Sequence, residues 1–297
     1  MKYVITGGAG NISKPLTEKL LKAGHDVTVI SRNAENIKSL TDLGAKGAIG
    51  SVNDIAFLKT TFADADAVYT MVPPNYATND MKASIAEVGR NYAAALKATN
   101  VKYVVNLSSV GAHLPDGVGP VNGLYRVEQA LNELKDINIK HLRPVYFFAN
   151  FLGNVDMVKN MNIIGGNFGG ANFKMLLADT NDIAEVAFEE LSKLDFSGHS
   201  IRYIASDERS TEDIAKVLGN SINKPQLPWV TFSDEQTYGA LLQMGLPENI
   251  AKNYAEMGHA VHDGSMFADY WKHRPAQLGK TKLEDFAKTF AIVYNSN

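Results

Sequence analysis

The start of the chain alternates short apolar runs with an amphipathic stretch. Residues 2–6 and 26–30 are apolar runs typical of strands, and residues 14–23 carry apolar positions at helical spacing. A glycine-rich segment at residues 7–13 precedes the amphipathic stretch, and Gly24 follows it where a helix-terminating glycine belongs. The pattern predicts a strand, a loop, a helix and a second strand.

The same alternation continues to residue 142. It predicts helices at residues 35–43, 55–62, 81–98 and 122–134, and strands at residues 46–49, 67–72, 103–107 and 139–142. Strands that alternate with helices form a parallel sheet with helices on both faces and right-handed crossovers. The predicted fold class is therefore α/β, a doubly wound parallel sheet of the Rossmann type.

Beyond residue 150 the pattern changes. Residues 160–173 are rich in Asn and Gly and predict a mobile loop or an irregular insert. Residues 200–205 predict one more strand of the sheet. Further helices are predicted at residues 179–193, 234–244 and 248–258, and from Thr211 onward with either Thr211 or Ser210 as the N-cap.

The glycine-rich segment predicts a dinucleotide site. Gly7 allows a tight turn, Gly10 lets the backbone approach a pyrophosphate, and the amides of Asn11 and Ile12 open a helix whose positive end faces the anion. The third glycine of this motif is replaced by Ser13, so we expect a slightly wider site. A purely structural turn is the alternative. The loop residues assigned to the cofactor are Gly7, Ala9, Gly10, Asn11 and Ile12.

The tip of the second strand indicates which cofactor binds. An NAD site places Asp or Glu there for the ribose hydroxyls, whereas this chain has Ser31, Arg32 and Asn33. A guanidinium suits a 2′-phosphate, so we expect NADP(H) in preference to NAD(H), with Arg32 and Asn33 in contact with it. The alternative for Arg32 is an ordinary surface charge.

Other strand ends lie at the same edge of the predicted sheet. Ser51 and Val52 follow the third strand, on the adenine side, and Met71 and Val72 end the fourth strand beside the nicotinamide half. Ser108 follows the fifth strand. The prolines after Val72 have a simpler alternative role, which is to end the strand.

Composition excludes several classes of protein. The chain has 297 residues, 45% of them apolar, a formal net charge of -3 and no cysteine. Nucleic-acid or membrane-surface partners are not expected from this charge, and thiolate catalysis and disulfides are excluded. No run of about 20 apolar residues is present, so we expect a soluble cytoplasmic protein. His259 and His262 lack a third metal ligand, and we predict no metal site.

The motifs occur in an order that resembles a known family, the NmrA-like group of atypical short-chain dehydrogenases. The similarity covers nearly the whole chain, including residues 211–219 and 234–245 near its end. The motifs that carry it are Thr6 to Ile12, Arg32, Ser108, Glu128-Gln129-Ala130-Leu131, Arg143-Pro144 with Phe147 and Asn150, and Asp182-Ile183-Ala184.

The resemblance implies a Rossmann domain and a small, mainly helical C-terminal domain with the active cleft between them. It assigns residues 1–150 and 179–205 to the NAD(P)-binding domain, and residues 151–178 and 206–297 to the small substrate-binding domain. A small-molecule acceptor is implied as partner, and a homodimer is possible. The residues that it implies in dinucleotide contact are Gly7 to Ile12, Arg32, Ser51, Val52, Val72, Pro73 and Phe147 to Asn150.

The catalytic pair of the wider family is missing. Active short-chain dehydrogenases use a Tyr and, four residues later, a Lys, and the positions aligned with them here hold Pro120 and Leu124. Neither residue can transfer a proton, so the catalytic residues are unknown. Weak candidates for a displaced proton donor are Ser108, His113, Tyr125 and Tyr146, each with packing or a loop position as the plainer role.

Loss of this pair favours an acceptor that accepts hydride easily. A quinone-like or small aromatic acceptor needs mainly positioning and hydrogen bonds to the developing oxyanion. We therefore expect an NADPH-dependent oxidoreductase similar to the quinone reductases of the family. The alternative is a non-catalytic NADP(H)-binding redox sensor that acts through a protein partner, and a sugar-nucleotide epimerase is a distant third.

Overall fold

The computed structural model describes residues 1–170 and 173–296. Its central feature is a seven-stranded sheet in the order β10-β6-β5-β4-β1-β2-β3, in which every neighbouring pair of strands is parallel. The strands are β1 (Lys2–Ile5), β2 (Asp26–Ser31), β3 (Lys46–Ile49), β4 (Ala67–Thr70), β5 (Tyr103–Leu107), β6 (Asn138–Pro144) and β10 (His199–Ile204).

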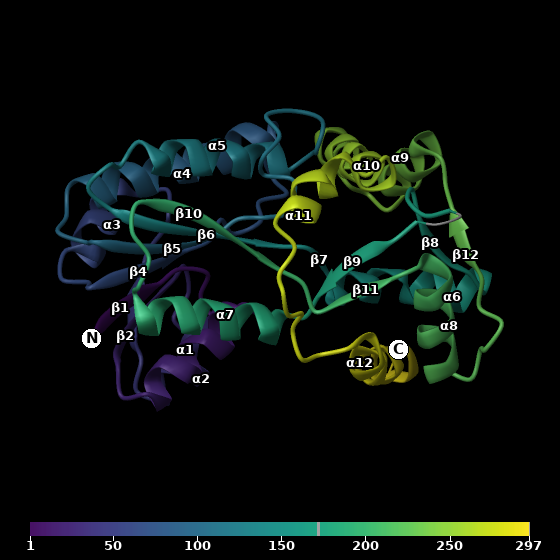
Figure 1. Cartoon of the computed structure of the whole chain (residues 1–297), viewed down its shortest axis with the longest axis horizontal. Helices are drawn as coiled ribbons and strands as arrows, with labels where there is room; N and C mark the ends of the chain where they lie inside the picture. Colours follow the sequence, from purple (N-terminus) through teal and green to yellow (C-terminus); the bar gives the residue numbers. More distant parts are fainter. Residues whose placement is uncertain (171–172, 297) are drawn as a thin grey trace.

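Helices cover both faces of this sheet (Figure 1). One face carries α1 (Ser13–Lys22), the short η1 (Glu35–Ile37) and α2 (Lys38–Thr41), and α7 (Thr180–Lys193). The other face carries α3 (Ile55–Phe62), α4 (Met81–Lys97) and α5 (Val121–Asn132). The predicted fold class is confirmed, and the strand at residues 200–205 does join the sheet. No helix in the described residues is long and apolar enough to cross a membrane.

The smaller half contains two small sheets and several helices (Figure 1). The strands are β7 (Tyr146–Phe147), β9 (Met175–Ala178) and β11 (Asp207–Arg209) in one sheet, and β8 (Ile164–Gly166) and β12 (Trp229–Thr231) in the other. The helices are η2 (Phe148–Asn154), α6 (Val155–Met161), α8 (Thr211–Ser221), α9 (Asp234–Gln243), α10 (Glu248–His262), η3 (Ser265–Phe267), α11 (Ala268–Lys272) and α12 (Leu283–Ser296).

One sequence prediction was partly wrong. Residues 160–173 were expected to be irregular throughout, yet Ile164–Gly166 forms β8 because it pairs in parallel with β12, some 65 residues later. Residues 171 and 172 of that segment lie outside the described residues. At α8 the structure decides between the two expected N-caps, since the Ser210 hydroxyl accepts a hydrogen bond from the Asp213 amide at 3.0 Å.

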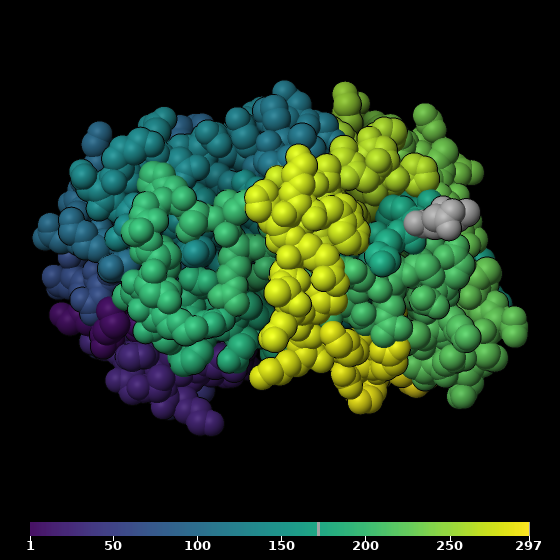
Figure 2. Space-filling view, in the orientation of Figure 1, coloured from purple at the N-terminus to yellow at the C-terminus, as the bar shows by residue number. Residues whose placement is uncertain are grey.

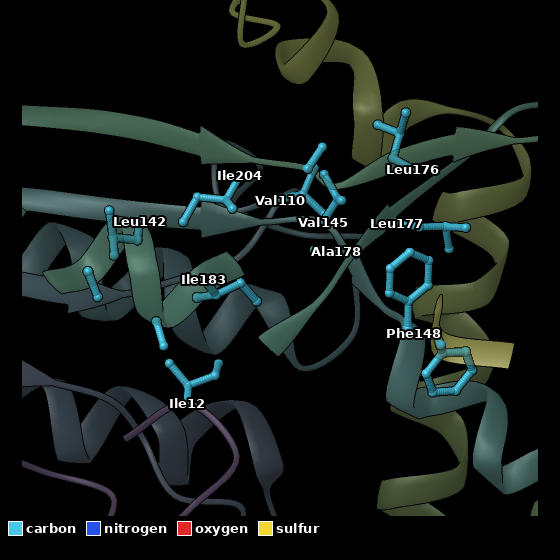
Figure 3. Close-up of a cluster of buried hydrophobic side chains, with 14 of the residues drawn as sticks. Ile12, Val110, Leu142, Val145, Phe148, Leu176, Leu177, Ala178, Ile183 and Ile204 are labelled. Atoms are coloured by element: carbon cyan, nitrogen blue, oxygen red, sulfur yellow. The ribbon is translucent and has the colours of Figure 1, made fainter. Parts of the chain in front are cut away.

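One buried hydrophobic cluster extends through both halves, and a second lies between the large sheet and α3, α4 and α5. Buried side chains run without a break from Ile12 and Leu142, beneath the large sheet, to Leu177 and Phe148 in the smaller half (Figure 3). The cluster continues to Phe290 in α12. The division into a Rossmann domain and a substrate domain stays a prediction, and the packing between its two parts is continuous.

The C-terminal segment ties the halves together. The chain from α11 to α12 crosses the front of the molecule between them (Figure 2). Asp182, at the start of α7, accepts hydrogen bonds from the Ser206 hydroxyl at 2.7 Å and the Thr281 amide at 3.1 Å. The Lys282 ammonium donates to the Ser206 carbonyl at 2.6 Å. The Asp182 motif seen in the sequence therefore fastens this crossing segment to the large sheet.

Candidate functional site

The sheet topology brings the predicted cofactor residues to one edge. All seven strands are parallel, so their carboxyl ends share an edge, and the strand order reverses between β1 and β4. Ligands of such sheets bind at the point where the order reverses. Gly7 follows β1 and Met71 follows β4, so the loops at this point are the predicted cofactor loops.

The glycine loop has a backbone that other residues would strain. Gly7 has φ of 92° and Gly8 has φ of 57°, both in the left-handed region. A Cβ on Gly7 would lie 2.6 Å from the Ser13 hydroxyl and 2.8 Å from Met71 Cγ. The Gly8 amide donates to the Ile30 carbonyl at 3.1 Å, which fixes the loop to the end of β2. Glycine at position 7 is thus required by both torsion and space.

Ser13 replaces the usual third glycine without a polar conflict. Its hydroxyl is buried and donates to the Thr6 carbonyl, at the end of β1, at 2.9 Å. A buried hydroxyl with an acceptor costs little. The slight widening expected from this replacement stays a prediction.

The first turn of α1 is open to an anion. Its N-cap is Ile12, which supplies no side-chain hydrogen bond, and the first turn holds no acidic residue. Free backbone amides at a helix N-terminus, together with the helix dipole, favour a bound anion. A Cβ on Gly10 would lie 3.2 Å from the Gly7 carbonyl oxygen, and Gly10 itself is exposed, so its backbone is accessible to a ligand.

The turn after β2 is stabilised by side-chain hydrogen bonds and carries an arginine without an ion-pair partner among the described residues. The Ser31 hydroxyl donates to the Asn33 carbonyl at 2.8 Å, and the Asn33 side chain accepts a hydrogen bond from the Glu35 amide at 2.9 Å. Arg32 is exposed and forms no ion pair with any described residue. The turn therefore presents a guanidinium whose hydrogen-bonding capacity is unused.

The loops after β3 and β4 are also ordered by the chain itself. The Ser51 hydroxyl accepts from the Asn53 amide at 3.2 Å, and Val52 is half-buried. The Met71 amide donates to the Thr6 hydroxyl at 2.8 Å, which links the ends of β1 and β4 directly. Met71, Val72 and Pro73 are half-buried, so they present surface along this edge.

The residues after β6 are less uniform. Phe147 is half-buried in β7, while Asn150 is exposed in η2. Phe148 lies between them in the sequence and is buried. Its ring stacks on Phe286 of α12, with 5.5 Å between the ring centroids. The dinucleotide contacts predicted for Phe147 and Asn150 stay predictions.

Ser108 belongs to a closed polar cluster. Ser108 is only 5% exposed, and its hydroxyl donates a hydrogen bond to the Glu128 carboxylate at 2.5 Å. Glu128 also receives two hydrogen bonds from Arg143, at 2.6 and 3.0 Å. The Ser108 proton is therefore held by a carboxylate inside the protein and is not free for a substrate.

Arg143 extends this cluster to the C-terminal segment. Its guanidinium donates to the Tyr203 hydroxyl at 3.2 Å and to Asp269 at 3.3 Å, and the Tyr203 hydroxyl donates to Asp269 at 2.6 Å. Burial alone would lower the pKa of Arg143, but the hydrogen bonds and charge of Glu128 outweigh it and raise that pKa. We call Ser108, Glu128, Arg143, Tyr203 and Asp269 the arginine cluster.

Sequence reasoning missed much of this cluster. Glu128 and Arg143 stood out as family motifs, but nothing in the sequence joined them to Tyr203 on β10 or Asp269 on α11. The same holds for a buried chain of hydrogen bonds from Thr70 through Asn106 to His141. A polar residue inside a predicted strand, such as Asn106 in an otherwise apolar run, was the available signal for that chain.

The other weak candidates differ in what their polar atoms do. His113 is half-buried, its Nδ1 is enclosed without a hydrogen-bond partner in the described chain, and burial lowers its pKa despite the opposing charge of Asp269. Tyr125 is half-buried on α5. The Tyr146 ring packs on Phe151 and Phe168, at 5.3 and 5.7 Å between centroids.

The Tyr146 hydroxyl is free. It makes no hydrogen bond with the described residues. It also differs from the buried polar atoms that are fully enclosed without a partner, such as His113 Nδ1. Burial of the ring raises the pKa of the phenol, so it stays protonated at neutral pH. The hydroxyls of Tyr125 and Tyr146 both make no hydrogen bond with the described residues, and of these two tyrosines Tyr146 is the one that follows a strand of the large sheet.

His259, one of the two histidines near residue 260, makes a surface contact. His259 Nδ1 lies 2.8 Å from Asp234 Oδ2, and both side chains are exposed. Within the described residues no group of three His, Asp or Glu side chains could hold a metal ion. The geometry gives this pair a role in joining α9 and α10.

Comparison with known proteins agrees with this geometry. Residues 7–140 match the model of an NAD(P)H-binding family. An uncharacterized oxidoreductase, YesF of Bacillus subtilis, is 25% identical over 99% of this chain and 96% of its own length. A 37% identical match to an uncharacterized protein of Schizosaccharomyces pombe covers 23% of each chain. The family match is confined to residues 7–140, and membership of the NmrA-like atypical short-chain dehydrogenases stays a prediction.

Solved structures of low sequence identity share the fold of this chain. The NADPH-dependent quinone oxidoreductase QOR2 of Escherichia coli, complexed with NADPH, has a TM-score of 0.83, 21% identity and coverage of 97% of this chain and 99% of that one. The triphenylmethane reductase of Citrobacter sp., complexed with NADP(H), has a TM-score of 0.80, 21% identity and the same coverage. The chain thus has the same fold as these two reductases, which were solved with NADPH and NADP(H).

Proposed function

We propose that this protein is an NADPH-dependent reductase that transfers hydride to a quinone-like or small aromatic acceptor. The observation that carries the proposal is the open edge of the sheet, where the bare glycine loop, the uncapped start of α1 and the unpaired Arg32 follow neighbouring strands. The names of the similar solved proteins, a quinone oxidoreductase and a triphenylmethane reductase, support this class of acceptor.

The residues at this edge fit a phosphorylated dinucleotide. The loop from Gly7 to Ile12 would hold the pyrophosphate with backbone amides, because a side chain at Gly7 or Gly10 would meet atoms already in place. Arg32 would bind the 2′-phosphate. Ser51 and Val52 would border the adenine, and the segment from Met71 to Pro73 the nicotinamide half. When bound, the reduced nicotinamide supplies the hydride.

The described residues at the positions of the usual pair offer no proton donor, which favours an acceptor that does not need a strong one. Pro120 is the N-cap of α5 and Leu124 is half-buried within it, so neither position of the usual pair carries a titratable group. Ser108 is occupied by Glu128. A quinone becomes a stabilised oxyanion on hydride transfer, and a positioned hydrogen-bond donor is sufficient help.

Tyr146 is our assignment for that donor. Its hydroxyl makes no hydrogen bond with the described residues, burial raises its pKa further above neutral, and it lies two residues beyond the carboxyl end of β6. A neutral phenol can donate a hydrogen bond to an oxyanion without giving up its proton. The proton that completes the product then comes from water.

The direct test follows NADPH consumption. We expect protein saturated with NADPH to oxidise it when a simple quinone is added, as measured by the loss of reduced-nicotinamide absorbance. Binding of NADPH with no oxidation across several quinones and a triphenylmethane dye would contradict the proposal. It would favour the redox-sensor alternative, which rests on Pro120 and Leu124 alone.

A second test addresses Tyr146. We expect Tyr146→Phe to slow hydride transfer by roughly 10- to 100-fold in single-turnover measurements, since one oxyanion donor is lost, with little change in NADPH affinity. Tyr125→Phe is the matched control and should leave the rate unchanged. Equal rates in the two variants would remove Tyr146 from the site. The expected cytoplasmic location and homodimer stay predictions.

A further inference from the structure

A groove lies at the edge of the large sheet opposite the cofactor loops. Its volume is about 840 Å³. It is bounded by the C-terminal parts of α4 and α5 and by Val101, Lys102, Asp136 and Ile137, which come just before β5 and β6. Parallel strands begin at one edge of the sheet and end at the other (Figure 1). The groove, at the edge where β5 and β6 begin, is therefore separate from the predicted dinucleotide site at the opposite edge.

The groove collects positive charge on a chain whose net charge is -3. It contains five cations and two anions, a local excess of three positive charges. None of the five cations forms an ion pair with a described residue, although ion pairs are frequent elsewhere in the chain. The cations are Arg90, Lys97, Lys102, Arg126 and Lys135, and the anions are Glu133 and Asp136.

Helix ends explain only some of these cations. Lys97 lies in the last turn of α4, and the Lys135 ammonium donates to the Asn132 carbonyl at the end of α5, at 2.7 Å. The positive charges of these two lysines interact favourably with the negative ends of the helix dipoles. Arg90 and Arg126 lie in the middle of their helices and are exposed. Nothing within the described chain neutralises these two guanidinium groups.

The floor of the groove is apolar. It is lined by Ala93, Leu96, Ala130, Leu134 and Ile137, beneath the charged rim. Small-ligand sites have about 300 to 1,000 Å³, a mostly apolar lining and a few charged groups that fix the ligand. Guanidinium groups bind phosphate in a bidentate manner. An apolar floor under a cationic rim fits an organic group that carries phosphate.

We propose that this groove binds an organic phosphate, of the size and charge of a nucleoside triphosphate, at a second site independent of the dinucleotide site. Arg90 and Arg126 hold the phosphate groups, and the alanine and leucine side chains of α4 and α5 contact the organic part. The site goes beyond the proposed reductase function and does not depend on it.

Calorimetry tests the proposal on the full chain saturated with NADPH, so that the dinucleotide site is filled. ATP without metal and inorganic tripolyphosphate are the probes. We expect one ATP site, with tripolyphosphate binding more weakly because it lacks the organic part. The double variant Arg90→Ala with Arg126→Ala should weaken ATP binding by about tenfold or more, since charge-assisted hydrogen bonds are lost.

The control removes two exposed cations outside the groove that also form no ion pair. Lys22→Ala with Lys216→Ala changes the net charge equally and should leave ATP binding unchanged. Equal weakening in both double variants would show a general charge effect and overturn the proposal. So would the absence of binding, equal affinity for ATP and tripolyphosphate, or a change of oligomeric state in the groove variant that indicates a subunit contact there.

Discussion

Two polar regions of the molecule differ in how far the chain satisfies them. At the cofactor edge, the first turn of α1 has no cap and Arg32 has no partner. In the arginine cluster, the Arg143 guanidinium donates to Glu128, Tyr203, Asp269 and the Ala112 carbonyl. The first region is open to a ligand, whereas the second already contains its own ligands.

The difference shows which polar residues to assign to binding. Buried charges are stable only when paired and hydrogen-bonded, and the arginine cluster meets that condition while joining the large sheet to α11. Unpaired donors at a surface are solvated at no cost and remain available. The residues that carry the family resemblance therefore fall into two groups. Arg32 and the glycine loop are available for binding, whereas Glu128 and Arg143 stabilise the structure.

The largest expected effect is in the closed region. Glu128→Ala leaves Arg143 buried beside Asp269 with too little negative charge, and we expect the free energy of unfolding to fall by about 3 to 5 kcal/mol. Denaturant unfolding measures it. NADPH affinity of the folded variant should change by less than about threefold, because the loss is structural.

The control for this variant is an exposed ion pair. Lys38→Ala removes the contact to Asp42 at 2.8 Å and should cost only about 0.5 kcal/mol or less. A similar loss of stability in the two variants, or a loss of NADPH binding by Glu128→Ala with normal stability, would show that the closed region takes part in binding.

A second effect concerns pH. His141 is buried, accepts from the Asn106 amide at 3.1 Å and lies 3.0 Å from the Asn132 side-chain oxygen, so the neutral ring is held with its proton on Nε2. Burial lowers the pKa of His141 to about 4 from its ordinary 6.5. The unfolded chain therefore takes up a proton between these pH values that the folded chain does not.

The free energy of unfolding should consequently fall as the pH drops from 6.5 towards 4, by at most roughly 3 kcal/mol from this residue. Unfolding curves over this range measure the fall. His141→Gln cannot titrate, so its pH dependence should be flatter by the same amount. Identical pH dependence in the two proteins would mean that His141 is protonated in the folded state.

A smaller expected effect concerns the glycine loop. Two glycine-to-alanine variants distinguish the cost of a positive φ from the cost of a steric contact. Gly7→Ala and Gly24→Ala both place alanine at a positive φ, 92° and 81°, but only the first Cβ meets other atoms. Each should lose about 1 to 2 kcal/mol of stability from the torsion. Only Gly7→Ala should also lose NADPH affinity, by about tenfold, because the loop must shift away from Ser13 and Met71. Unchanged affinity in Gly7→Ala would place the pyrophosphate elsewhere.

Local patterns made the open region predictable from sequence. The glycine loop, its helix and the Arg32 strand tip lie within 32 residues, and their spacing alone fixes their geometry in a parallel sheet. The main strands were predictable for the same reason, since each is a short apolar run between helical stretches.

Distant pairings made the rest unpredictable. β8 exists only because it pairs with β12, and β9 only because it pairs with β7 and β11. Asp269 joins Arg143 across 126 residues, and neither residue type nor spacing points to that contact. The absence of the Tyr and Lys pair was predicted from Pro120 and Leu124 and stays a prediction, whereas the availability of the Tyr146 hydroxyl required the packing around it.

The most direct test of the open edge is an equilibrium titration of the wild-type protein and Arg32→Ala with NADPH and with NADH. We expect the wild-type protein to bind NADPH more tightly, and Arg32→Ala to lose about 1 to 3 kcal/mol of NADPH binding with NADH binding unchanged. A wild-type preference for NADH, or an unchanged preference for NADPH in the variant, would contradict the assignment of Arg32 to the 2′-phosphate and with it the account of this edge.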